Sequence, residues 1–353
     1  MRCSEKPAVP ELTGELLRDH TTLRLGGPAE RWVRATTEAE LVQALVDADT
    51  AGEPVLVLGG GSNLVVADRG FPGTVIEVAT TGAEIDADEG ASCGGAMVRV
   101  AAGESWDELV ALAVDRGWVG IEALSGIPGS VGATPIQNVG AYGQEVSQTI
   151  ASVRVWDRML RGVRTFANAD CRFGYRTSRF KADPARHVVL SVSYQLPQGD
   201  LGAPVAYAEL ATALGVELGQ RAPLADVRRA VLALRAGKGM VLDPADHDTW
   251  SAGSFFTNPV VDAAEVPAGA PAWPQADGRV KTSAAWLIDR AGFGKGYGND
   301  RVALSGKHTL ALTNRGAATT DDLLALAREV RDGVAARFGI VLVNEPVLVG
   351  AEL

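Results

Sequence analysis

A run of three glycines marks the first place where the backbone could hold a phosphate. Gly59, Gly60, Gly61, Ser62 and Asn63 follow the apolar residues 55–58. Glycine lets a backbone approach a phosphate closely and direct its N–H groups at the oxygens. The run lacks the lysine of a Walker loop and the spacing of a G-x-G-x-x-G turn. Taken alone, it therefore favours an ordinary tight turn between two strands.

A second glycine-rich segment covers residues 127–143. Its sequence, IPGSVGATPIQNVGAYG, is too irregular for a continuous helix or strand and too apolar for a solvated linker. Long irregular stretches inside compact domains are uncommon and are often functional. We expect an extended backbone whose amide groups are satisfied by a large cofactor. The alternative is a buried Ω-loop that serves packing alone.

Three further side chains have types that suit acid–base or anion chemistry. Arg176 carries a permanently charged planar fork, which matches the geometry of a carboxylate. Ser254 follows a glycine and precedes two phenylalanines, and Glu345 precedes a proline. Each also has an ordinary interpretation: a surface arginine in a charged stretch, a turn serine and a glutamate at the end of a strand. Residue type alone does not separate these interpretations.

The charge of the chain limits its partners. The 353 residues carry a formal net charge of −10. This argues against nucleic acid or an anionic membrane as a partner, because both bind preferentially to a positively charged surface. An anionic ligand would need positive charge concentrated at its own site. Only six lysines occur, so Lys238 beside glycines and Lys281 before a predicted helix stand out.

Periodicity predicts the elements that must position these residues. Apolar residues share one helical face over 38–50, and Ser105 with Glu108 resembles a capping box for a helix through Arg116. We expect further helices over 224–235, 283–291 and 319–338. We expect strands over 55–58, 64–66, 75–78, 97–102, 153–156, 188–196 and 340–343. The mixture is α+β rather than a regular βαβ alternation.

Length and composition predict a globular protein of two or three domains. No apolar run approaches the roughly 20 residues of a membrane helix, and the first 20 residues lack a signal-peptide core. We therefore expect a cytoplasmic protein, and a monomer. Cys3, Cys93 and Cys171 form no C-x-x-C pair, which predicts reduced thiols and no metal site.

Six blocks of sequence resemble UDP-N-acetylenolpyruvoylglucosamine reductase and keep the order found in that family. They are residues 59–63, 127–132, 135–143, 171–176 (CRFGYR), 253–259 (GSFFTNP) and 274–278 (PQADG). The resemblance spans about residues 20–350. It implies a two-subdomain FAD-binding domain of the vanillyl-alcohol oxidase type, over 1–84 (rejoined by 344–353) and 85–222. A C-terminal α+β substrate-binding domain would cover 223–343.

The resemblance also implies an activity and its residues. The reaction would be the NADPH-dependent reduction of UDP-N-acetylglucosamine enolpyruvate to UDP-N-acetylmuramate through FAD, a step of peptidoglycan synthesis. Ser254 would donate a proton, while Arg176 and Glu345 would stabilise the enolate, the latter when protonated or hydrogen-bonded. The implied FAD contacts are Gly59, Gly60, Gly61, Ser62, Asn63, Ile127, Pro128, Gly129, Ser130, Gly132, Ala133, Gln137, Asn138, Gly140, Ala141, Tyr142 and Gly143.

A second set of residues would contact the nucleotide-sugar. It comprises Tyr142, Tyr175, Arg176, Tyr207, Lys238, Asn258, Trp273, Lys281 and His308. Two of these depart from the family pattern. Trp273 stands where relatives carry tyrosine, which loses a phenolic donor but keeps a stacking face. His308 stands where some relatives have glutamine.

Two other functions are weighed against this one. A flavin-dependent oxidase of the related FAD-domain group would, in its covalent members, need a suitably placed histidine. The four histidines, His20, His187, His247 and His308, lie outside both glycine-rich segments. A protein that holds flavin or UDP-sugar without turnover is the other alternative, and the complete set of Arg176, Ser254 and Glu345 argues against it.

Overall fold

The structure is a computed structural model that describes residues 14–87 and 95–353. Cys3 and Cys93 lie outside the described residues, and Cys171 is a free, buried thiol. No helix among the described residues is long and apolar enough to cross a membrane. Helices and strands are mixed along the chain, as the α+β prediction requires.

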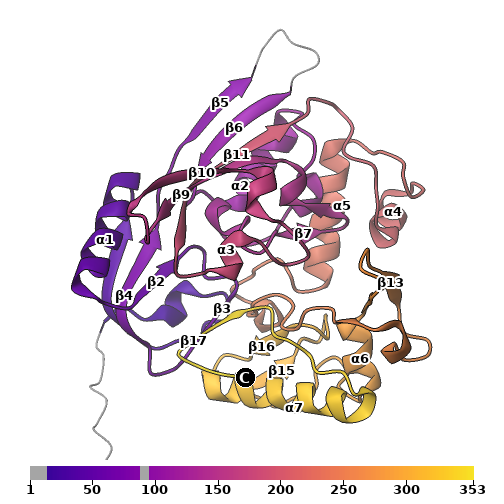
Figure 1. Cartoon of the computed structure of the whole chain (residues 1–353). Helices are drawn as coiled ribbons and strands as arrows, with labels where there is room; N and C mark the ends of the chain where they lie inside the picture. The colour runs from indigo at the N-terminus through magenta and orange to yellow at the C-terminus, as the bar shows by residue number, and fades with distance from the viewer. Residues whose placement is uncertain (1–13, 88–94) are drawn as a thin grey trace, which may run out of the picture.

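The N-terminal part is a parallel sheet with one helix. Its strands are β1 (Ala29–Ala35), β4 (Phe71–Val78) and β2 (Val55–Leu58), in the spatial order β1-β4-β2. The helix α1 (Glu38–Ala51) begins at a capping box between Thr37 and Glu40 and ends at the left-handed Gly52. Its predicted apolar face is buried against the sheet, and it forms the outer edge of the molecule (Figure 1).

An antiparallel sheet of five strands follows. The spatial order is β10-β9-β11-β6-β5, with β5 at Ala83–Ala87, β6 at Ala96–Ala101, β9 at Ile150–Asp157, β10 at Gly162–Ala167 and β11 at His187–Leu196. The helix α2 (Trp106–Asp115) is capped by the hydroxyl of Ser105, as predicted. One apolar cluster joins α1, α2 and both sheets, so the two sheets share a core.

Two helices form a smaller cluster beside α2. They are α4 (Ala208–Leu214) and α5 (Leu224–Gly237), which pack on each other and on the 3-10 turn η2 (Glu122–Leu124). The predicted helix over 224–235 is therefore confirmed, whereas α4 was not predicted. The predicted domain limits at residues 84, 222 and 343 stay a prediction.

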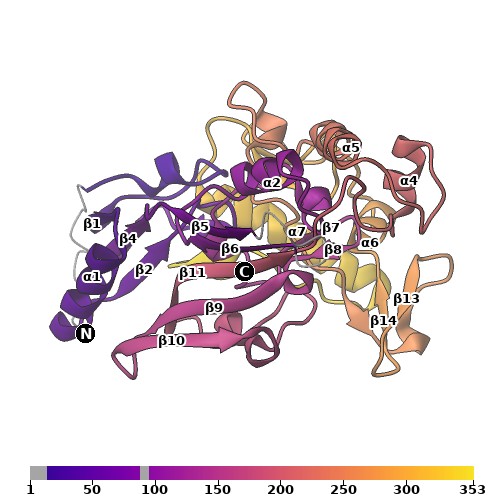
Figure 2. The same ribbon diagram turned by 90° about the horizontal axis from the view of Figure 1, so that it is seen from above.

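The C-terminal part contains two small sheets and two helices. The strands are β12 (Val260–Val261), β13 (Ala272–Pro274) and β14 (Val280–Thr282), and the pair β15 (Val302–Leu304) and β16 (Leu312–Asn314). The predicted helices are confirmed as α6 (Ala284–Arg290) and α7 (Thr320–Phe338), and α7 begins at a capping box between Thr319 and Asp322. Figure 2 shows that β13 and β14 lie at the opposite end of the molecule from α1.

The predicted strand over 340–343 is wrong. Its burial does alternate, because Ile340 and Leu342 are buried while Val341 and Val343 are exposed. The segment nevertheless lacks a ladder, and the last strand is β17 (Val347–Val349), which pairs in parallel with β3 (Leu64–Val66). Alternation reports an extended, half-buried backbone, whereas a strand also needs a neighbour for its hydrogen bonds. The strand pairing therefore begins after Pro346 and ties the C-terminus to the first glycine run.

Candidate functional site

The two predicted cofactor segments lie against each other. A Cβ placed on Gly60 would come within 2.7 Å of the Cα of Gly129, so this close approach requires glycine. The hydroxyl of Ser62 donates to the carbonyl of Pro128 at 3.1 Å. The side-chain amide of Asn63 donates to Gln137 at 2.8 Å. The glycine run after β2 and the segment over 127–143 thus form two adjoining walls.

These walls enclose a cleft of about 300 Å³. Eleven of the predicted cofactor residues line it: Gly59, Gly60, Gly61, Ser62, Asn63, Ile127, Pro128, Ser130, Ala133, Gln137 and Gly140. Among the described residues that line it, three carry positive charge (Arg176, Lys181 and Arg235) and one, Glu345, carries negative charge. Positive charge is therefore concentrated here in a chain whose net charge is −10, as an anionic ligand would require.

The other predicted cofactor residues lie behind or beside the cleft. Gly129 packs on Gly60, and Gly132 packs on Ala102. Asn138 is buried, with its amide donating to Glu145 and to the carbonyl of Gly174. It therefore orders the loop, while Ala141, Tyr142 and Gly143 belong to the small hairpin of β7 (Gly140–Ala141) and β8 (Gln144–Glu145) or its turn.

Arg176 and Glu345 form an ion pair inside the cleft. The Nε of Arg176 lies 3.1 Å from the Oε1 of Glu345, and both side chains are mostly buried. The N–H does not point at that oxygen, so the contact is an ion pair without an aligned hydrogen bond. A second nitrogen of the fork donates to the carbonyl of Gly140 at 2.8 Å. The guanidinium is thus fixed to the loop, and its buried Nε–H has no hydrogen-bond partner within the described residues.

Backbone pairing brings Ser254 beside Glu345. The N–H of Glu345 donates to the carbonyl of Phe255 at 2.8 Å, and Phe256 forms a β-bridge with Asn344. Phe255 and Phe256 are buried in the C-terminal core, which holds this segment in place. Ser254 lines the cleft, and no other described residue hydrogen-bonds to its hydroxyl. The three predicted catalytic residues therefore meet in one cleft.

Burial and charge act in opposite directions on Glu345. Burial raises the pKa of Glu345, and the charges of Arg176 and Lys181 work against that rise. A raised pKa brings the protonated form of this carboxyl closer to neutral pH. The group can therefore hold a proton beside a ligand carboxylate more readily than an exposed glutamate can.

One set of predicted substrate residues surrounds Tyr175. The ammonium of Lys281 lies 4.5 Å from the centre of the Tyr175 ring and 5.9 Å from that of Trp273. Burial raises the pKa of the Tyr175 hydroxyl, and hydrogen bonding with Asn258 acts against that rise. Trp273 is exposed, so its ring is available for stacking.

A second set surrounds Tyr142. Its ring meets the edge of Tyr207 at 5.7 Å between centroids, and the ammonium of Lys238 lies 5.5 Å from its centre. Lys238 also pairs with Glu209 of α4. Burial, helped by the charges of Lys238 and Lys295, lowers the pKa of His308 to about 4. Tyr142 thus lies beside Tyr207 and Lys238 and does not line the cleft, and its two predicted roles stay predictions.

The sequence prediction missed two cations of the cleft, Lys181 and Arg235. Lys181 follows Arg172, Arg176 and Arg179 in a stretch whose charges suit a solvated surface, and nothing in the local pattern of α5 separates Arg235 from Arg228 and Arg229. The Nε of Arg235 is inaccessible and unpartnered within the described part of the chain, and burial lowers the pKa of this guanidinium to about 10. Only their burial in the folded protein distinguishes Lys181 and Arg235 from the other lysines and arginines nearby in the sequence.

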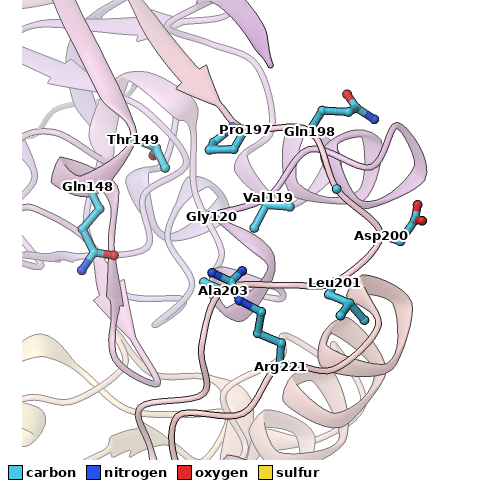
Figure 3. A pocket seen from close by; sticks show the side chains of 11 residues that line it. Val119, Gly120, Gln148, Thr149, Pro197, Gln198, Asp200, Leu201, Ala203 and Arg221 are labelled. Atoms are coloured by element: carbon cyan, nitrogen blue, oxygen red, sulfur yellow. The ribbon is translucent and has the colours of Figure 1, made fainter. Parts of the chain in front are cut away.

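A second cavity, of about 540 Å³, lies away from these residues (Figure 3). It is lined by Val119, Gly120, Gln148, Thr149, Pro197, Gln198, Gly199, Asp200, Leu201, Ala203 and Arg221. Gln198 and Asp200 point away from the other lining side chains, and Arg221 donates to the carbonyl of Gly202. The polar groups of this second cavity do not converge. The glycine-lined cleft is therefore the better candidate site, although it is the smaller of the two.

The cleft fits an FAD molecule on two observations. Its glycine turns bring two backbone segments together without side chains between them, which suits close contact with a diphosphate. Arg235 has a desolvated guanidinium whose acidic neighbour, Asp107, already pairs with Arg228. A buried cation of this kind is stabilised by an anionic ligand. The residues that would hold the group are therefore the glycine-rich walls and Arg235.

Two family models match the chain. Residues 29–160 match a family described as FAD binding domain. Residues 243–349 match the UDP-N-acetylenolpyruvoylglucosamine reductase, C-terminal domain. The first match covers both glycine-rich segments, and the second covers Ser254 and Glu345.

Several similar proteins carry the same name. The UDP-N-acetylenolpyruvoylglucosamine reductase of Streptomyces avermitilis is 59% identical over 98% of this chain and 96% of its own. That of Thermobifida fusca is 57% identical over 96% of this chain and 97% of its own. The crystal structure of the corresponding reductase from Thermus caldophilus superposes with a TM-score of 0.64 at 28% identity, covering 95% of this chain and 97% of that one. The chain therefore belongs to the UDP-N-acetylenolpyruvoylglucosamine reductase family, as an oxidoreductase with an FAD-binding domain.

Proposed function

We propose that the chain reduces the enolpyruvyl ether of UDP-N-acetylglucosamine enolpyruvate with NADPH and releases UDP-N-acetylmuramate for peptidoglycan synthesis. The observation that carries the proposal is the meeting of Arg176, Ser254 and Glu345 in the glycine-lined cleft. From the sequence alone, we also propose a cytoplasmic monomer. When bound, FAD would take a hydride equivalent from NADPH and deliver it to the substrate.

The protein would stabilise the charge that develops on the substrate. Addition of hydride to the methylene carbon leaves an electron pair on the neighbouring carbon, which spreads into the carboxylate. Arg176 carries a permanent charge and lines the cleft, so it would bind that carboxylate and hold the increasing negative charge. Glu345, with its raised pKa, would contribute as a hydrogen-bond donor in its protonated form.

Ser254 would supply the proton that completes the reduction. Its hydroxyl lines the cleft and has no protein partner within the described residues, so it is available to a ligand. An alcohol is a weak acid, but a carbon with carbanion character is a strong enough base to take its proton. Hydride and proton then add across the double bond, and the substrate gains two hydrogen atoms.

The same geometry supports a division of the nucleotide-sugar between two groups of residues. Lys281, Tyr175, Trp273 and Asn258 form one group of neighbours, and Tyr142, Tyr207, Lys238 and His308 form another. Lysines near aromatic rings suit a diphosphate joined to planar and sugar groups. We propose that these residues bind UDP-N-acetylglucosamine and orient its enolpyruvyl ether.

Product analysis under nitrogen tests this function. The purified protein is incubated with NADPH and UDP-N-acetylglucosamine enolpyruvate, and the nucleotide is examined by mass spectrometry. The expected product is heavier by two hydrogen atoms, in proportion to the NADPH consumed. Consumption of NADPH that requires air, with unchanged nucleotide, would support an oxidase. Flavin binding with no consumption of NADPH would support a non-catalytic binding protein.

A further inference from the structure

Lys181 is fixed next to the cofactor segment by its own short helix. It lies on α3 (Arg179–Ala182), which begins at Ser178. The hydroxyl of Ser178 accepts from the N–H groups of Phe180 and Lys181 and donates to the carbonyl of Ile136 at 2.5 Å. Phe180 is buried in the core of the two sheets. The backbone of Lys181 is therefore anchored, and its side chain reaches into the cleft.

The ammonium of Lys181 holds an unusual backbone conformation in Arg176. Arg176 lies in a tight turn in which the N–H groups of Gly174 and Thr177 each donate to the other residue's carbonyl, at 3.0 and 3.2 Å. Its φ of 52° is in the left-handed region, which non-glycine residues rarely adopt. The Nζ of Lys181 donates to the carbonyl of Arg176 at 3.1 Å. This contact fixes the peptide that aims the guanidinium into the cleft.

Lys181 also changes the charge balance around Arg176. Alone, Arg176 and Glu345 would cancel, and a ligand carboxylate would gain little by entering. The charges that act on Glu345 are those of Arg176 and Lys181, whereas the charges that act on the Tyr175 hydroxyl are those of Arg176 and Glu345. Arg235 adds a further cation on another wall of the cleft. With Lys181 protonated, Arg176, Lys181 and Glu345 together carry a net positive charge.

We propose that Lys181 is a positioning residue for the reductive step. It holds Arg176 in its left-handed turn and offsets the charge of Glu345 whenever that carboxyl is ionised, so that the fork of Arg176 is available to the substrate carboxylate. The inference rests on the proposed function and extends it from three residues to four. Burial works against the charge of this ammonium, and Glu345 supports it, so the two groups depend on each other.

Two variants of Lys181 separate this role from simple packing. Lys181→Met keeps the length of the side chain without its charge or donor, whereas Lys181→Arg keeps both. Arg179→Met is the matched control, because Arg179 lies on the same helix, donates to the carbonyl of Asp170 and does not line the cleft. Flavin content and thermal unfolding are measured for each variant, followed by reoxidation of the NADPH-reduced protein by UDP-N-acetylglucosamine enolpyruvate without oxygen.

The expected result is a selective loss. Reoxidation should slow by about 10- to 100-fold in Lys181→Met, recover largely in Lys181→Arg and stay within about twofold of wild type in Arg179→Met. In Lys181→Met, Glu345 keeps the charge of Arg176 but loses that of Lys181, so the pKa of Glu345 should rise. Activity that needs protonated Glu345 should therefore persist to a higher pH than in wild type. A Met variant with the wild-type rate and pH profile would overturn the inference alone. A wild-type protein that the substrate does not reoxidise would overturn the proposed function together with it.

Discussion

The carboxylate of Glu345 lies 3.1 Å from the guanidinium of Arg176, although Arg176 lies in the middle of the chain and Glu345 lies near its C-terminus. Their contact depends on two separate connections. The turn over 174–177 presents Arg176, and the pairing of 343–345 with 255–257 presents Glu345. Ser254 sits at the start of the second connection. Several measurable consequences depend on this arrangement and on the two cations around it.

The hydroxyl of Ser254 should matter for only one half of the reaction. In Ser254→Ala, reduction of the flavin by NADPH should remain substantial, because hydride arrival needs no proton from the protein. Reoxidation by the enolpyruvyl substrate should fall by about 10²-fold or more, the usual value of a positioned general acid. Stopped-flow absorbance of the flavin measures both steps.

Ser251→Ala provides the control for the local turn. The hydroxyl of Ser251 accepts from the N–H of Gly253, just before Ser254, without lining the cleft. Its loss should change reoxidation by less than about tenfold, because a single neutral hydrogen bond is worth about 1 kcal/mol. Equal losses in both half-reactions of Ser254→Ala would contradict the general-acid role.

Arg235 should raise the affinity of the protein for FAD and lower the stability of the flavin-free protein. In Arg235→Gln, the affinity for FAD should fall by about tenfold or more, since a charged hydrogen bond contributes about 1.5–3 kcal/mol. The flavin-free variant should unfold at the same temperature as wild type or higher, because a desolvated cation has been removed. Fluorescence titration and thermal melts measure the two quantities.

Arg228→Gln is the matched control on the same helix. Arg228 forms two hydrogen bonds to Asp107, at 2.7 and 2.8 Å, and does not line the cleft. Its substitution should lower stability and leave the affinity for FAD within about threefold of wild type. The role of Arg235 fails if the two variants lose flavin affinity equally.

The ring of Tyr207 should matter more than its hydroxyl. Tyr207 is 48% exposed, and its ring and that of Tyr142 pack in a T-shaped, edge-to-face arrangement, so the contact is between the aromatic rings. Tyr207→Ala should raise the KM for the nucleotide-sugar by up to about tenfold, in keeping with 0.5–1.5 kcal/mol for an aromatic pair. Tyr207→Phe should stay close to wild type. A Phe variant as weak as the Ala variant would instead point to the hydroxyl.

The stability of the protein should depend on His308 below neutral pH. Its pKa is lowered from 6.5 to about 4, so between these values the unfolded chain binds a proton that the folded protein does not. The contribution to stability is therefore complete above about pH 6.5 and is lost as the pH falls toward 4. Because the side chain is partly solvent-accessible, the loss should amount to about 1–2 kcal/mol rather than the full shift.

Paired urea titrations measure this dependence. The free energy of unfolding is compared at pH 7.5 and pH 5 for wild type and for His308→Gln. Wild type should lose more stability than the variant over this interval. Parallel losses in the two proteins would show that His308 is protonated equally in the folded and unfolded states.

The sequence was sufficient for the elements with strong local signals. The helices α1, α2, α5, α6 and α7 were predicted from the sequence, α2 with the help of its capping residue Ser105, and the segment over 127–143 was recognised as unusual backbone. The strand over 340–343 was misplaced because alternation does not show where a partner strand lies. Here the partner is β3, which pairs only with residues after Pro346.

The limits for the candidate site are physical as well. Arg176, Ser254 and Glu345 were predicted through family resemblance, since their separate sequence contexts equally suit surface or turn residues. Lys181 and Arg235 were missed because the burial of a cation depends on tertiary contacts. Lys181 contacts the carbonyl of Arg176, and Arg235 lines the cleft.

Anaerobic stopped-flow on the wild-type flavoprotein tests the reductase function. NADPH is added until the visible absorption of the flavin is lost, and the reduced protein is mixed with UDP-N-acetylglucosamine enolpyruvate. We expect rapid return of the oxidised flavin spectrum without oxygen, with formation of UDP-N-acetylmuramate. Return of the spectrum only after air is admitted would contradict the reductase function, and a colourless protein that takes up no FAD would contradict the cofactor assignment.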